Sequence, residues 1–124
     1  MAITSNITGS GSAALNAQAI QGFVFNALTT TGAQLTQANG FPIPGCINEF
    51  TTVAASSAAV LRANLTPSDY QEVYNFGGQA LLVFPPVGES INALSANASL
   101  SVANGGKAIF KKVSNTRWVA IVSA

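Results

Sequence analysis

The fold is decided by the stretch Tyr70-Gln71-Glu72-Val73-Tyr74-Asn75-Phe76-Gly77-Gly78-Gln79-Ala80-Leu81-Leu82-Val83-Phe84-Pro85-Pro86. Its first six residues alternate, with Tyr70, Glu72 and Tyr74 on one face and Gln71, Val73 and Asn75 on the other, which predicts a strand. The glycine pair turns the chain. Residues 80–84 are apolar at every position, which predicts a central strand covered on both faces. Pro85 and Pro86 end this strand, because proline has no backbone N–H to donate to a neighbouring strand.

Further short strands are expected on both sides of this stretch. The segment 39–45 is dense in breakers and is read as turns, and 54–63 tolerates a helix but favours a short strand at 60–62. No internal repeat of fixed period is visible. Short strands with turns at this spacing predict an all-β fold, an antiparallel β-sandwich or a jelly-roll-like barrel. The other expected strands are 23–25, 50–53, 91–94, 99–102, 107–113 and 117–122.

The N-terminal part of the chain differs from the rest. Residues 1–20 hold few large apolar side chains, no charge and the linker-like Gly9-Ser10-Gly11-Ser12. Such a segment cannot bury enough apolar surface to order itself. We therefore expect two parts, an extended N-terminal arm at 1–20 that orders on a partner and a β domain at 21–124.

The composition excludes several kinds of chemistry and favours assembly. Only 7% of the 124 residues are charged while 48% are apolar, so a free monomer would have little to keep it from associating. The absence of His removes the usual general base and the commonest metal ligand. Cys46 is the only cysteine, so neither an internal disulfide nor a multi-thiolate metal site is possible. No cofactor and no metal are expected.

Charge and hydropathy also bear on partners and location. The net charge of +1 is too weak to attract nucleic acid or an acidic membrane. No apolar run approaches the roughly 20 residues of a membrane helix. The first residues lack the features of a signal peptide, so we expect a chain made and used without export, in contact with neither nucleic acid nor membrane.

The carboxylates do not form an obvious catalytic pair. Asp69 and Glu72 are the only close pair in sequence, and at a strand start this separation puts the two side chains on opposite faces. Glu49 and Glu89 are expected at strand starts in solvent. No catalytic residue is therefore predicted.

Four of the five basic residues fall in the last two predicted strands, and they are the candidate partner-binding residues of the β domain. They form either a basic lip that meets an acidic partner or a solvated hairpin end that discourages edge pairing. By alternation, Lys107 and Lys111 share a face with Ile109, while Lys112 shares the other face with Phe110. Trp118 is either a ligand platform or, as its apolar strand favours, part of the core or a subunit contact. The candidate partner-binding residues are Ile3, Ile7, Lys107, Lys111, Lys112 and Arg117.

Roughly residues 23–124 of the chain resemble small virion structural proteins of tailed bacteriophages. The residues that carry the resemblance start at Asn48-Glu49-Phe50-Thr51-Thr52-Val53 and continue through residues 73–86 of the stretch above. It then follows Gly88-Glu89-Ser90-Ile91-Asn92-Ala93-Leu94, Ala96-Asn97, Ser101-Val102-Ala103-Asn104-Gly105, Phe110 and Trp118.

This resemblance implies a capsid decoration (cement) protein, a kind of protein that is non-enzymatic, mostly β and commonly trimeric. Such proteins sit on the outer shell where subunits of the major capsid protein meet. The location implied is the virion, with assembly in the host cytoplasm. The alternative is a tail-fibre or tail-tip module that binds host surface glycan. The resemblance assigns no functional residue, because the shared pattern reads as turns and core.

Overall fold

A computed structural model describes residues 24–123, which form ten β-strands and no helix. The all-β prediction is confirmed for this part of the chain, and the helix considered over 54–63 is replaced there by a short strand. The proposed arm at 1–20 lies outside the described residues. The strands are β1 (Val24–Thr29), β2 (Phe41–Pro42), β3 (Ile47–Thr52), β4 (Ala58–Val60), β5 (Tyr70–Asn75), β6 (Leu81–Phe84), β7 (Ser90–Ile91), β8 (Leu100–Val102), β9 (Lys107–Lys112) and β10 (Arg117–Ser123).

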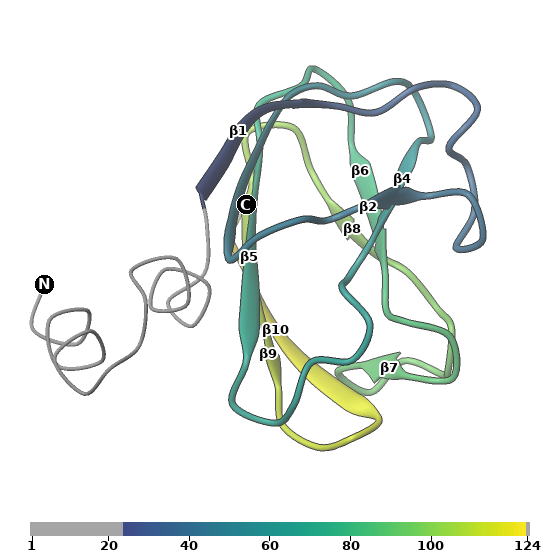
Figure 1. The fold of residues 1–124 in the computed structure, drawn as a ribbon. Helices are drawn as coiled ribbons and strands as arrows, with labels where there is room; N and C mark the ends of the chain where they lie inside the picture. The colour runs from purple at the N-terminus through teal and green to yellow at the C-terminus, as the bar shows by residue number, and fades with distance from the viewer. Residues whose placement is uncertain (1–23, 124) are drawn as a thin grey trace, which may run out of the picture.

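The first six strands alternate between two sheets. Sheet A has the order β1-β3-β5-β9-β10-β7 and sheet B the order β2-β4-β6-β8 (Figure 1). Since each strand crosses to the other sheet before the chain returns, β1, β3 and β5 run parallel, as do β2, β4 and β6. In sheet A, Val24 is the partner of Ile47, and Ile47 is in turn the partner of Glu72, so each coil advances the chain by a similar length. The arrangement is solenoid-like.

The expectation of a purely antiparallel sheet pairing is wrong. Five of the eight strand pairs are parallel, and the three antiparallel pairs, β5 with β9, β9 with β10 and β6 with β8, all involve the second half. Turn-forming residues show where the chain reverses, but not whether the next strand pairs with the last one or crosses to the opposite sheet. The crossing strand provides the long connection that parallel pairing requires.

The core lies between the two sheets. Phe50, Val73, Phe110 and Trp118 from sheet A meet Leu81, Val83 and Val102 from sheet B, and all seven are fully buried. The alternation predicted for β5 is confirmed, because Gln71, Val73 and Asn75 point inward. Strand β6 is central in sheet B, but Leu82 and Phe84 on its outer face are only half-buried. The prediction that both faces of this strand are covered is therefore confirmed for the inner face and holds only in part for the outer face.

Buried amide side chains satisfy the backbone where the chain turns from one sheet to the other. Asn48 donates to the carbonyls of Gly45 and Glu72 at 2.8 and 2.9 Å and accepts from the Gly45 amide. Asn75 donates to the carbonyls of Gln79 and Val102 and accepts from the Gly77 amide. Within residues 24–123, no buried side-chain nitrogen or oxygen lacks a partner. Each amide thus ties one corner to a neighbouring strand.

The corner at Gly77 has no room for a side chain. A Cβ there would lie 2.5 Å from the backbone nitrogen of Val53, whose N–H donates to the Gly77 carbonyl. We expect Gly77→Ala to lower the free energy of unfolding by about 1–3 kcal/mol, as overpacking does. The matched control is Gly32→Ala, because nothing lies near a Cβ at Gly32 and its φ is ordinary. Urea denaturation that shows equal midpoints for the two variants would contradict this reading of the corner.

Candidate partner-binding surface

The outward side of sheet A carries the candidate binding surface. Strands β5, β9 and β10 lie side by side, and strand alternation points one residue in two away from the core. The paired positions form three rows across the strands, Tyr70–Lys111–Val119, Glu72–Ile109–Ile121 and Tyr74–Lys107–Ser123. We call these nine residues the outer face.

Apolar side chains lie in the middle of the outer face. Ile121 is 64% exposed and Val119 is also exposed, although both belong to a regular strand. A hollow of about 200 Å³ opens beside them, lined by Tyr74, Lys107, Ile109, Ile121, Val122 and Ser123. Exposed aliphatic and aromatic side chains next to a shallow hollow are typical of a surface that is covered by another molecule.

The two tyrosines at the edge of the outer face are held as neutral phenols. Tyr74 donates a short hydrogen bond to Glu72, and this bond is the main reason that the pKa of Tyr74 is raised above its ordinary value. Partial burial is the main cause of the raised pKa of Tyr70, followed by the charges of Cys46 and Glu72. Both rings therefore offer an apolar face and an uncharged hydroxyl near neutral pH.

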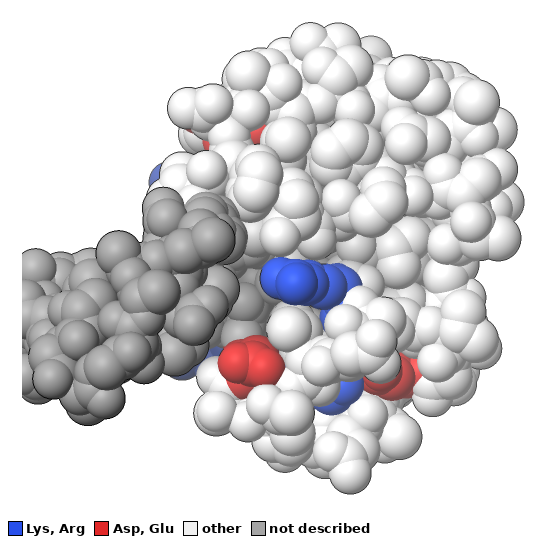
Figure 2. All heavy atoms as spheres, viewed as in Figure 1, with Lys and Arg blue, Asp and Glu red and all other residues white. Residues whose placement is uncertain are grey.

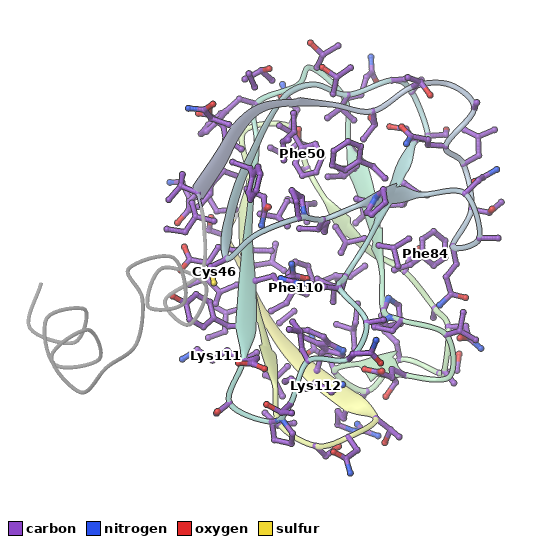
Figure 3. All side chains as sticks on the ribbon, viewed as in Figure 1. Cys46, Phe50, Phe84, Phe110, Lys111 and Lys112 are labelled. Carbon is purple, nitrogen blue, oxygen red and sulfur yellow. The ribbon has the colours of Figure 1, made fainter. Side chains whose placement is uncertain are left out.

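The structure separates the basic residues that the sequence grouped together. Lys107 and Lys111 are exposed on the outer face, as their alternation predicts. Lys112 points the opposite way, into the molecule, and is 4% exposed (Figure 3). Its prediction as a partner-binding residue is therefore wrong, because it lies on the inner face of β9 with Ala108 and Phe110. The alternation of residues 107–112 had already placed Lys112 on the face opposite to Lys107 and Lys111.

Lys112 forms part of a buried polar cluster with Glu89 and Trp118. One carboxylate oxygen of Glu89, Oε1, lies 3.2 Å from Lys112 Nζ and accepts a 2.8 Å hydrogen bond from Trp118 Nε1. The Lys112 ammonium also lies 5.7 Å from the centre of the Trp118 ring. Trp118 is fully buried, which confirms core packing and removes it as a platform for ligands. The expectation that Glu89 lies in solvent is wrong, since its side chain is 14% exposed and doubly bound.

The remaining candidate residues have different positions. Arg117 is exposed at the start of β10, and its guanidinium donates to the Asn92 carbonyl at 2.6 Å, so it also braces the loop after β7. Ile3 and Ile7 lie outside the described residues. The structure therefore brings together Lys107 and Lys111 on one face, and it places Arg117 at the end of a neighbouring strand.

The two carboxylates that lie close in the sequence, Asp69 and Glu72, make separate local hydrogen bonds. Asp69 accepts hydrogen bonds from the backbone and hydroxyl of Thr66, which closes a turn, while Glu72 is bound to Tyr74 on the outer face. No three His, Cys, Asp or Glu side chains in this range lie close enough to hold a metal ion. Asp69 and Glu72 thus each serve local structure.

Charged side chains gather on part of the face that is seen in Figure 2. Figure 2 shows the charged side chains in the lower part and at the left of the view, with the upper right uncharged. Three of the four edge strands of the two sheets are short. Strands β2 and β7 have two residues each, and β8 has three. Short edges offer little template for pairing. The outer face, by contrast, spans three adjacent strands of six or seven residues each, β5, β9 and β10.

No protein family matches this sequence, and no curated protein is similar to it. Within the described residues, none of the structure is a helix of the length and apolar character that crossing a membrane requires.

Two adjacent lysines provide a direct test of the buried cluster. We expect Lys112→Ala to lower the free energy of unfolding by about 3–5 kcal/mol, because Glu89 would keep a buried charge without its partner. Lys111→Ala, one residue away on the outer face, should change it by about 0.5 kcal/mol or less. Chemical denaturation of both variants measures the difference. If Lys112→Ala lowers the free energy of unfolding as little as Lys111→Ala does, the result would contradict this prediction and show that water reaches the Glu89 carboxylate.

Proposed function

We propose that this chain is a non-enzymatic structural protein of a bacteriophage virion, a capsid decoration protein that binds the outer shell and stabilises contacts between major capsid proteins. The observation that carries the proposal is the outer face, where Ile109, Val119 and Ile121 lie beside two exposed lysines on paired strands. The sequence resemblance to small virion proteins supports the same class.

The proposed role is mechanical. A decoration protein adds buried area across neighbouring capsid subunits, and stable interfaces bury about 1,200–2,000 Å² in total. A paired sheet suits this task, since its backbone is already ordered before it docks. Lys107 and Lys111 would meet acidic groups of the capsid protein and orient the contact.

A tail module that binds glycan is the competing function. Such a module needs exposed aromatic platforms, and the single tryptophan of the sequence is buried in the core. Tyr70 and Tyr74 remain on the outer face, but Tyr74 is occupied by its bond to Glu72. The balance therefore favours a protein partner over a sugar.

Binding to capsids that lack this protein tests the proposal. We expect Ile121→Glu to weaken binding by about tenfold or more, which corresponds to about 1.4 kcal/mol, because a carboxylate would be buried in the contact. The control is Val87→Glu, since Val87 is 81% exposed in the loop between β6 and β7, outside the outer face. Sedimentation with capsids measures both variants. Equal binding of the two would remove the outer face from the interface.

Electron microscopy of virions labelled on this protein addresses the location separately. Label over the shell supports a decoration protein, whereas label confined to the tail would overturn it in favour of the glycan-binding module.

The proposed assembly is a homotrimer. The resemblance to decoration proteins implies a trimer, and with 7% charged residues little repulsion opposes self-association. We expect light scattering at micromolar concentration to give three times the 12.6 kDa of one chain. A mass of one chain at that concentration would contradict it.

A further inference from the structure

The hollow on the outer face has the size of a single large side chain. Its volume is about 200 Å³, whereas sites that enclose a small molecule measure about 300–1,000 Å³. A cavity of about 150 Å³ can already hold a benzene ring. The hollow is therefore too small for most free ligands, but it can take an apolar side chain that another protein presents. Side chains that fill such hollows contribute much of the binding energy of protein–protein contacts.

The hollow combines apolar walls with a positive charge at its rim. Ile109 and Ile121 are partners in one row, and Tyr74 and Lys107 are partners in the next. The Tyr74 hydroxyl donates to Glu72. Among residues 24–123 the one ion pair joins two other side chains of the cluster around Trp118, so the exposed Lys107 has no carboxylate partner in this part of the chain. The hollow thus suits an apolar group that lies next to an anion.

A second lysine gives the outer face a defined order of charges along β9. Lys107 and Lys111 lie on the same side of the strand, two positions to either side of Ile109, and Figure 3 shows Lys111 on the side opposite to Lys112. At about 3.4 Å per residue, the Cα atoms of the two lysines are about 14 Å apart. Glu72 is the partner of Ile109 on β5, so a carboxylate lies beside the middle position. The order along β9 is therefore positive, apolar with an acid beside it, and positive.

We propose that the outer face binds an extended segment of its protein partner in which one large apolar residue has a carboxylate two residues to either side. The three side chains point the same way, because residues two apart share a face of an extended chain. The apolar side chain fills the hollow, and the carboxylates pair with Lys107 and Lys111. A carboxylate at the middle position would meet Glu72 and be repelled, which gives the site selectivity. This inference rests on the proposed function for its choice of a protein as the partner.

A synthetic peptide tests the proposed segment with the full chain. The peptide has Leu at its centre, Asp two positions to either side, Thr elsewhere and blocked ends. Because it reads the same from both ends, it can dock in either direction. Titration into the isotope-labelled protein, followed by NMR, gives both the location of binding and the dissociation constant. We expect the largest shifts at the amides of Lys107, Ile109 and Ile121, which line the hollow. Absence of shifts there would overturn the proposal.

Three matched peptides separate the features of the segment. Asn in place of both Asp residues should weaken binding about threefold to tenfold, as the loss of two exposed ion pairs does. Ser in place of Leu should weaken it about tenfold or more, because the hollow stays unfilled. A peptide in which Leu and one Asp are exchanged keeps the composition but brings a carboxylate towards Glu72, so it should also bind more weakly. Equal dissociation constants for all four peptides would contradict the proposal.

Protein variants provide the second readout. Lys107→Gln should weaken binding of the Asp peptide about twofold to fivefold, as the loss of one exposed ion pair does, and leave binding of the Asn peptide unchanged. The control is Arg62→Gln, which removes the same charge from an exposed position between β4 and β5, outside the outer face. It should leave the binding of both peptides unchanged. An equal loss in the two variants would show an effect of net charge alone and would overturn the proposed pairing.

Failure of this inference and failure of the proposed function give different results. If Ile121→Glu weakens binding to capsids but the Leu-centred peptide does not bind, the outer face remains the interface and the proposed segment is wrong. If the peptide binds as expected but labelled virions carry this protein only on the tail, the chemistry of the segment stands and the decoration role is lost.

Discussion

The structure depends on satisfying the backbone at the corners where the chain leaves one sheet for the other. An antiparallel hairpin closes its own hydrogen bonds, but a chain that crosses between sheets brings backbone N–H and C=O groups into the interior without a ladder partner. Asn48, Gln71 and Asn75 supply those partners, and all three are buried. Gln71 alone donates to the carbonyls of Ile43 and Gly45 and accepts from the Arg62 amide. The parallel coils are possible because amide side chains, which carry donors and an acceptor, stand at inward positions.

This constraint also explains how polar groups are distributed between the two sides of sheet A. The inner side takes the amides and the Lys112–Glu89–Trp118 cluster, each fixed by several bonds. The outer face has no such task, and it presents isoleucine, valine, tyrosine and two exposed lysines on paired strands. The proposed function gives this face to a protein partner because exposed apolar side chains on it would be covered there.

The sequence predicts the strands better than their pairing. Alternation in residues 70–75 correctly placed Gln71, Val73 and Asn75 inside, since a period of two depends only on local geometry. The parallel pairing of β1, β3 and β5 depends on partners that are distant in the sequence, and unequal spacings hide such a repeat. For the candidate surface, alternation placed Lys107 and Lys111 correctly. The grouping of Lys112 with them followed charge instead of face, and its partner Glu89 lies in an earlier loop that no local pattern connects to β9.

An open coil and a low charge are difficult to combine in a stable protein. A six-residue edge strand next to half-buried Leu28 and Phe41 would invite pairing with any exposed strand, and a surface with 7% charged residues would do little to prevent it. Under the proposed function, association uses the outer face of sheet A instead, whose rows of lysine, isoleucine and tyrosine have a defined order.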